Sequence, residues 1–222
     1  ATGVSQLTAA NYYVERPVAC RGEFVQFFDE STYDPESWSW ELIGPSATLT
    51  SNEQNPIFEM RDQGIYTVKL TVTQGGITET IEDEDAFVVS DVYGSAMPFK
   101  ETFDGENRGW VSTTTRNDDS DYGWALSETD GFNDSYSYKM INYGQESTDE
   151  FDLYFTSVDF RPMTAISMNF KVAYARRSNL NQDKLSLAVS DDCGETWTLF
   201  WTGIASFMNN GKSNTSSAFS PE

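Results

Sequence analysis

Three aspartates near the middle of the chain form the first candidate for chemistry. Asp118, Asp119 and Asp121 lie within four consecutive positions between two predicted strands, and Glu101 and Asp104 precede them in the chain. Carboxylate oxygens are hard ligands, and Ca²⁺ takes about 6 to 8 oxygens from flexible loops. These five residues are therefore candidate ligands for a structural Ca²⁺. Their spacing does not fit an EF-hand loop, and a solvated acidic loop is the alternative.

A second polar pattern lies at residues 190–197, which read Ser-Asp-Asp-Cys-Gly-Glu-Thr-Trp. This order is typical of a tight β-hairpin turn. Asp192 is expected to accept hydrogen bonds from turn amides, and Gly194 to adopt a positive φ. Trp197 is expected to pack beneath the loop. We interpret these three residues as structural.

Aromatic side chains are candidates for stacking on sugar rings. Trp110, Tyr122 and Trp124 flank the acidic loop, and we single them out as possible glycan contacts. Aromatic residues also fill the cores of β-sandwiches, because each buries a large apolar area. A role in the core is the alternative for all three.

Catalytic constellations are missing from the sequence. The chain contains no histidine, which excludes Ser-His-Asp triads, Cys-His dyads and His-Glu-x-x-His zinc sites. Glycosidases use paired carboxylates, but no spacing here singles out an acid and a nucleophile. This segment is therefore predicted to have no catalytic residues and no cofactor other than the possible Ca²⁺.

The charge balance limits the classes of partner. The 222 residues include 35 acidic and 14 basic side chains, for a net charge of −21. Such a chain repels phosphate backbones, so nucleic acid is excluded as a partner. No apolar run approaches the roughly 20 residues that span a bilayer. An extracellular glycan or protein is the expected partner.

The chain has two cysteines, Cys20 and Cys193. They fall in different predicted domains, so we do not expect a disulfide between them. Two free thiols are unusual in a secreted protein, although a buried cysteine behaves as a small apolar residue.

The elements that would position these residues are all predicted to be strands. Residues 64–73 alternate so that Tyr66, Val68 and Leu70 share one face, which is typical of a half-buried antiparallel strand. Residues 1–13 are predicted as a connector, 14–90 as one domain, 91–98 as a linker and 99–222 as a second domain. Other strands are expected at 17–20, 24–29, 37–43, 57–60, 77–89, 99–103, 110–115, 124–126, 136–141, 151–155, 166–175, 184–190 and 196–202.

The first domain resembles the PKD family. Residues 55–72 follow that family's pattern, in which Asn-Pro leads into Gly-x-Tyr-x-Val-x-Leu-x-Val, and residues 22–27 match its Gly-x-x-Val-x-Phe strand. The resemblance implies an immunoglobulin-like sandwich with Trp40 and Tyr66 as core aromatics. Residues 40–45 depart from the family motif because they lack its Gly-Asp-Gly turn.

The second domain resembles the jelly-roll modules of the cleaved-adhesin and MAM-like type in secreted Bacteroidetes proteins. The matching segments are 101–105, 155–160, 169–175 and 183–190. The resemblance implies a jelly-roll β-sandwich that is incomplete at its C-terminal end, because further closing strands follow in such modules. It also implies a structural calcium and a secreted or cell-surface location.

The order of the two modules resembles the C-terminal region of secreted pappalysin-type metallopeptidases of Bacteroidetes. The resulting expectation is a non-catalytic accessory or adhesin-like region, with the PKD module as spacer and the jelly roll binding a glycan or protein. Two alternatives stay open. The chain is the C-terminal part of a zinc metallopeptidase whose catalytic domain lies upstream, or it is a structural stalk.

Overall fold

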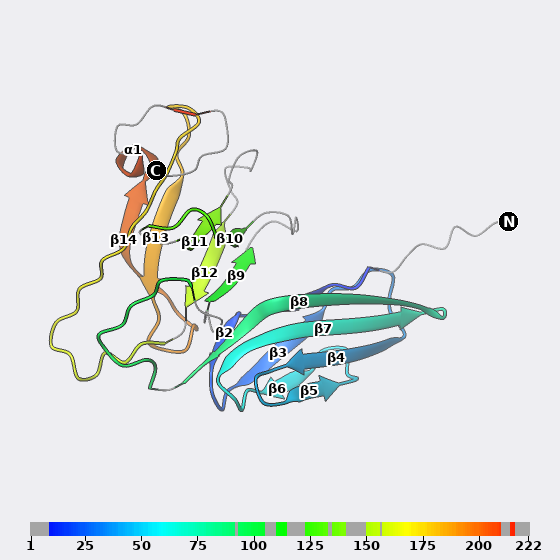
Figure 1. Ribbon diagram of the computed structural model, residues 1–222. Helices are drawn as coiled ribbons and strands as arrows, with labels where there is room; N and C mark the ends of the chain where they lie inside the picture. Colours follow the sequence, from blue (N-terminus) through cyan, green and yellow to red (C-terminus); the bar gives the residue numbers. More distant parts are fainter. Residues whose placement is uncertain are drawn as a thin grey trace. The chain divides into compact units, whose positions relative to one another are not determined.

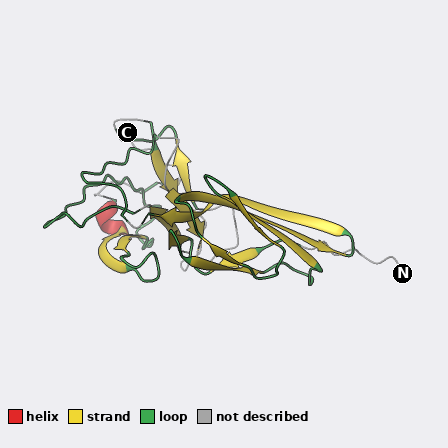
Figure 2. Cartoon of the chain, turned by 90° about the horizontal axis from the view of Figure 1, so that it is seen from below, coloured by secondary structure: helices red, strands yellow, loops and turns green. Residues whose placement is uncertain are grey.

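A computed structural model describes residues 9–91, 93–104, 110–114, 123–132, 135–140, 150–155, 157–209 and 214–215. Apart from loops, the secondary structure of the described residues is almost entirely β-strand (Figure 2), which confirms the predicted all-β fold class. In the described residues the one α-helix is α1 (Ala205–Met208), and no helix is long and apolar enough to span a membrane. The strands are β1 (Tyr12–Val14), β2 (Val18–Cys20), β3 (Phe24–Asp29), β4 (Ser37–Ile43), β5 (Thr48–Ser51), β6 (Ile57–Glu59), β7 (Gly64–Gln74), β8 (Ile77–Ser90), β9 (Trp110–Thr114), β10 (Trp124–Ser127), β11 (Ser137–Met140), β12 (Phe151–Phe155), β13 (Lys184–Val189) and β14 (Thr198–Ile204).

The first eight strands form a sandwich of two sheets (Figure 1). One sheet has the order β1-β3-β6 and the other the order β2-β8-β7-β4-β5. All pairs are antiparallel except β2 with β8, which run parallel. In chain order this arrangement matches the immunoglobulin fold, in which the A, B and E strands face the C, F and G strands.

The core of this sandwich lies between the two sheets. Phe27 of β3 is fully buried and contacts the rings of Trp40, Phe58 and Phe87 at centroid distances of 5.9, 5.7 and 6.0 Å. Trp40 and Phe87 belong to the five-stranded sheet, whereas Phe58 is on β6. Side chains alternate between the two faces of β7. Tyr66 and every second residue after it, up to Val72, therefore point into this core.

Tyr66 fixes the corner at the start of β7. Its side chain is 2 % exposed, and its hydroxyl donates a 2.8 Å hydrogen bond to the carbonyl oxygen of Asp62. A tyrosine that bonds back to the chain a few residues upstream is a hallmark of immunoglobulin-like sandwiches. Gly44 lies against the same ring, since a Cβ built there would stand 2.4 Å from Tyr66 Cε1.

The later strands form three two-stranded sheets, β9 with β12, β10 with β11, and β13 with β14. In the described residues the second predicted domain therefore contains three separate strand pairs and no continuous sheet. Residues 99–103 and 166–175 were expected to be strands. Both segments are described, but neither pairs with another strand. Conversely, β1 and β5 were not expected.

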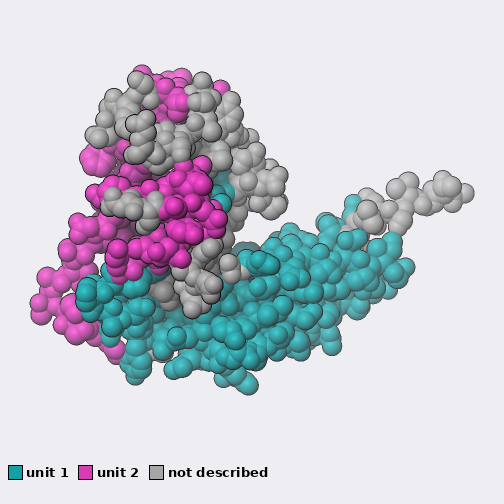
Figure 3. Space-filling view, viewed as in Figure 1, with its two compact units in different colours: residues 1–99, 106–125, 140–159 teal, residues 100–105, 126–139, 160–222 magenta. Residues whose placement is uncertain are grey.

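The chain comprises two compact units (Figure 3). Unit 1 comprises residues 1–99, 106–125 and 140–159, and unit 2 comprises residues 100–105, 126–139 and 160–222. The first unit therefore takes in segments that the sequence pattern assigned to the second domain. The division at residues 91–98 remains a prediction.

Candidate functional site

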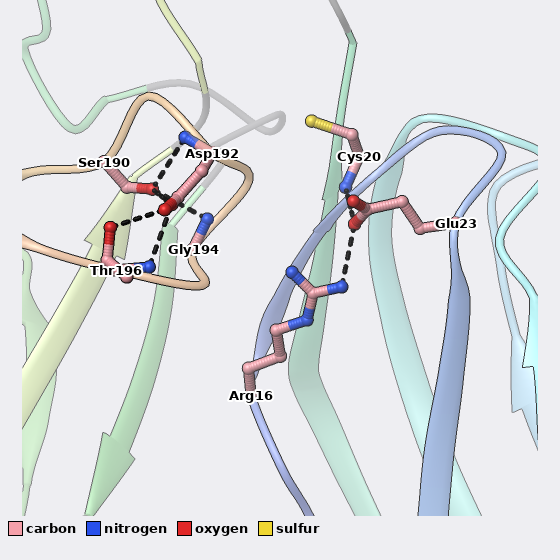
Figure 4. A network of polar contacts seen from close by, with 7 residues as sticks. All are labelled: Arg16, Cys20, Glu23, Ser190, Asp192, Gly194 and Thr196. Carbon is pink, nitrogen blue, oxygen red and sulfur yellow. Dashed lines mark hydrogen bonds and ion pairs between the residues drawn. The ribbon is translucent and has the colours of Figure 1, made fainter.

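A hydrogen-bonded turn at residues 190–197 joins β13 to β14 (Figure 4). The Asp192 carboxylate accepts hydrogen bonds from the Thr196 amide at 2.8 Å, from the Thr196 hydroxyl, and from the Ser190 hydroxyl at 2.7 Å. The Gly194 amide donates to Ser190 Oγ at 2.8 Å. Cys193 and Gly194 both have positive φ, at 61° and 86°.

These bonds set the acidity of Asp192. The hydroxyl and amide of Thr196, followed by the Ser190 hydroxyl, stabilise the carboxylate and lower the pKa of Asp192 to about 2. The side chain is therefore ionised at every physiological pH. Its acceptor capacity is used within the turn, so Asp192 has the geometry of a structural residue rather than of an acid or base.

The turn defines a two-stranded sheet with two different faces. The register places Leu185 opposite Gly203 and Leu187 opposite Trp201, and the three large side chains of these four residues are half-buried. The ring of Phe170 packs edge-on against Trp201 with centroids 5.1 Å apart. The face of the β13–β14 sheet that carries Leu185, Leu187 and Trp201 is therefore partly covered from within unit 2.

The other face is open. We define the open β13–β14 face as Lys184, Ser186, Ala188, Leu199, Phe200, Thr202 and Ile204. Leu199, Phe200 and Ile204 are 59, 53 and 49 % exposed, and the other four residues of this face are exposed too. A register shift between Leu187 and Ala188 makes room for Phe200 as an additional residue in β14. The Ser186 and Thr202 hydroxyls hydrogen-bond to each other at 3.1 Å across this face.

Exposed apolar side chains gather in unit 2 as a whole. Among the described residues, fourteen exposed large hydrophobic side chains lie in unit 2 and seven lie in unit 1. The buried hydrophobic side chains of the same described residues show the reverse, with fifteen in unit 1 and one, Ala205, in unit 2. A surface that gathers exposed apolar side chains in this way is a candidate interaction site.

The predicted calcium ligands are described only in part. Asp118, Asp119 and Asp121 lie outside the described residues. Glu101 accepts a hydrogen bond from the Phe103 amide at 2.6 Å, and Asp104 accepts one from the Thr102 hydroxyl. Within the described ranges, no group of three or more candidate ligands is close enough together to hold a metal ion. Calcium binding stays a prediction.

The three predicted glycan contacts do not form a described aromatic row. Trp124 is half-buried on β10, and its indole N–H donates a 3.0 Å hydrogen bond to the Phe151 carbonyl. Trp110 pairs with Phe155 in the backbone ladder of β9 and β12, and Tyr122 lies outside the described residues. Of the residues interpreted as structural, Trp40 is fully buried and donates from Nε1 to the Glu53 carbonyl at 3.0 Å, whereas Trp197 is 44 % exposed.

Both cysteines are disulfide-bonded, which corrects the expectation that no disulfide forms. Cys20 ends β2, and its amide donates to Glu23 Oε2 at 2.9 Å. The same carboxylate oxygen accepts a hydrogen bond from Arg16 Nη2 at 3.0 Å (Figure 4). The expectation failed because it was based on predicted domain membership, and disulfide formation depends on the distance between the cysteines in the folded chain.

Comparison with known proteins leaves the family open. No family model matches the sequence, and no curated protein matches it. One solved structure, from a study titled "Structural basis for the promiscuous specificity of the carbohydrate-binding modules from the beta-sandwich super family", is similar with a TM-score of 0.35 and 18 % identity. The match covers 60 % of this chain and 52 % of that chain, so it spans about half of that structure. The PKD, jelly-roll and pappalysin resemblances stay predictions.

The open β13–β14 face was missed by sequence reasoning. Its strands were expected, but alternation alone does not tell which face of an isolated hairpin is covered. The apolar residues at 199, 200 and 204 interrupt the polar alternation that a solvated face would show. That departure was the available signal.

Proposed function

We propose that this chain is a non-catalytic accessory region of a secreted or cell-surface protein, in which unit 2 binds a partner protein through the open β13–β14 face. The observation that carries the proposal is the exposure of Leu199, Phe200 and Ile204 on one side of a sheet whose other side is partly covered. Unit 1, with its complete core, serves as the rigid spacer.

The chemistry of the face favours a protein over a glycan. Sugar rings are recognised by flat aromatic side chains accompanied by polar groups. Here two of the three large apolar side chains are aliphatic, and aliphatic groups gain most from packing against other apolar side chains. Phe200 adds one aromatic side chain to the face. Polar groups that can make specific contacts are supplied by Lys184 and by the hydrogen-bonded hydroxyls of Ser186 and Thr202.

Extracellular placement is supported by the disulfide state of both cysteines, because disulfides persist in oxidising compartments. The net charge of −21 further favours neutral or basic partners. A catalytic domain upstream, as in a metallopeptidase, is compatible with this role, since an accessory region contributes binding rather than chemistry.

The test compares the wild-type chain with a Phe200→Ser/Ile204→Ser variant. Both chains are immobilised and incubated with extracellular proteins and with a panel of polysaccharides, and any retained partner is purified for calorimetry. Each side chain is about half exposed, so its burial contributes about 1 kcal/mol and the pair about 2 kcal/mol, or roughly 30-fold in Kd.

A matched control is Phe24→Ser. Phe24 is 69 % exposed on β3 of unit 1, so its replacement should leave partner binding unchanged. The proposal fails if the double variant binds the partner as tightly as the wild type. Retention of polysaccharides alone, lost in the double variant, would replace the protein partner with a glycan.

A further inference from the structure

The three-stranded sheet of unit 1 has one face in the core and one face open. Along β3, Val25 and Phe27 are buried, whereas Phe24 and Phe28 are 69 and 37 % exposed. The alternation of side chains along a strand produces these two faces. Residues paired across strands share a face, so the register extends the open side over β1 and β6. We define the outer β1–β3–β6 face as Tyr13, Phe24, Gln26, Phe28, Ile57 and Glu59.

Three of the four large apolar side chains on this face are aromatic, whereas one of three is aromatic on the open β13–β14 face. Tyr13 and Ile57 are 48 and 59 % exposed. The rings of Tyr13 and Phe28 are stacked, with their centroids 6.1 Å and their planes 29° apart. Phe24 lies four residues from Phe28 on the same strand, which is a separation of about 13 Å. The face therefore presents two separate aromatic positions along β3.

Gln26 lies between the two phenylalanines of β3 and presents a fixed hydrogen-bond acceptor. Its Nε2 donates at 2.8, 2.9 and 3.0 Å to three backbone carbonyls, those of Phe27, Asn55 and Pro56. These bonds set the orientation of the carboxamide, because a carbonyl can pair with its nitrogen and not with its oxygen. Gln26 Oε1 makes no hydrogen bond within the described chain and is not buried, and the Tyr13 hydroxyl has no partner there either. The face thus offers an acceptor and a hydroxyl beside its rings.

The charge of this face differs from that of the chain. Of its six residues, Glu59 is the one whose side chain is charged at neutral pH, and Arg61 donates to Glu59 Oε2 from Nε at 2.9 Å and from Nη2 at 2.7 Å. The face is therefore close to neutral, in a chain with a net charge of −21. The chain as a whole repels acidic ligands, and a neutral face complements a neutral one.

We infer that the outer β1–β3–β6 face binds a neutral oligosaccharide or polysaccharide chain that runs along β3. Pyranose rings have apolar C–H faces that pack on aromatic rings, and their hydroxyls need acceptors such as Gln26 Oε1. Rings in contact have centroids about 4.5–7 Å apart. A sugar ring on Phe24 is therefore out of contact with Phe28, about 13 Å away along the strand. The ligand must span at least two sugar units to use both positions.

The composition of the face favours a saccharide over a second protein partner. A basic protein segment would be held by unpaired acidic side chains, and the one acid among the six residues is already paired with Arg61. An aliphatic protein surface gains most from aliphatic neighbours, and Ile57 is the one aliphatic side chain of this face. The inference goes beyond the proposed function, in which unit 1 is a spacer, and it does not rest on the open β13–β14 face.

Affinity gel electrophoresis of the full 222-residue chain tests the inference. The gels contain mixed-linkage β-glucan, galactomannan or arabinoxylan as neutral probes and polygalacturonate as an acidic one. At least one neutral polysaccharide should retard the wild-type chain, and polygalacturonate should not. Phe24→Ala should raise the Kd roughly tenfold, because most of this side chain is free to be covered by the ligand. Phe24→Tyr keeps the ring and should bind within about twofold of the wild type, whereas Phe24→Leu keeps apolar bulk without a flat ring and should bind roughly 3- to 10-fold more weakly.

The matched control is Phe207→Ala, because Phe207 is 71 % exposed on α1 of unit 2. This variant should keep wild-type polysaccharide binding, and so should Phe200→Ser/Ile204→Ser, so the two proposals can fail separately. Urea unfolding midpoints equal to that of the wild type show that the variants at position 24 remain folded. The inference is overturned if no neutral polysaccharide retards the wild-type chain, or if Phe24→Ala binds as tightly as the wild type. Equal binding by Phe24→Leu and Phe24→Tyr would also overturn it, because apolar contact without ring stacking indicates a protein surface as the ligand.

Discussion

Replacement of Phe27 by alanine tests the register of the sandwich in unit 1. Phe27 is fully buried and contacts three aromatic rings across the two sheets, whereas its neighbour Phe28 points to the other side of β3 and is 37 % exposed. Truncation of a fully buried phenylalanine costs about 3–5 kcal/mol, because it removes transfer free energy and leaves a cavity. Phe28→Ala removes mainly a stacked contact with Tyr13 at 6.1 Å, which costs about 1 kcal/mol.

The assay is urea unfolding followed by tryptophan fluorescence, since Trp40 lies in the same core. With an m-value of about 2 kcal/mol/M, a loss of about 4 kcal/mol lowers the unfolding midpoint of Phe27→Ala by about 2 M. The midpoint of Phe28→Ala should fall by less than about 0.5 M. Equal losses, or a larger loss for Phe28→Ala, would show that β3 presents its other face to the core and would refute the register.

Three further outcomes are expected. The folded-state pKa of Asp192 is depressed to about 2, so its contribution to turn stability should be complete above pH about 4 and disappear as the pH falls through about 2. Carbon-detected NMR titration of the Asp192 carboxyl measures this pKa, and a normal carboxyl pKa would contradict the turn geometry. A thiol reagent should find no free thiol in the denatured, unreduced chain, because both cysteines are disulfide-bonded, and two reactive thiols would contradict this. Gly44→Ala should lower the free energy of unfolding by about 1–3 kcal/mol, since its Cβ would stand 2.4 Å from Tyr66 Cε1; an unchanged thermal midpoint would show that the ring moves aside.

Strands with a partner close in sequence were predictable. Gly64–Gln74 and Ile77–Ser90 form a hairpin around Gly75 and Gly76, which have φ of 56° and 80°. Alternation and turn chemistry agree there, so local sequence determines the structure. The three-residue strand Tyr12–Val14 was missed because its pairing with β3 is long-range and too short to leave a periodic pattern.

The segment 166–175 shows the opposite failure. Its alternation is as regular as that of β7, yet it forms no ladder in the described chain. Alternation records which side chains can share a face, but a strand also needs a neighbour for its backbone groups. The candidate site was hard to predict for a related reason, because the exposure of Phe200 depends on what covers β14 and not on β14 itself.

Hydroxyl-radical footprinting of the chain, free and with its purified partner, tests the central claim most directly. The account predicts that Leu199, Phe200 and Ile204 react readily in the free chain, as their exposure requires, and become protected in the complex, whereas Phe24 and Ile57 of unit 1 react equally in both. Protection confined to unit 1, or side chains on the open β13–β14 face that are already unreactive in the free chain, would contradict the assignment of this face as the binding surface.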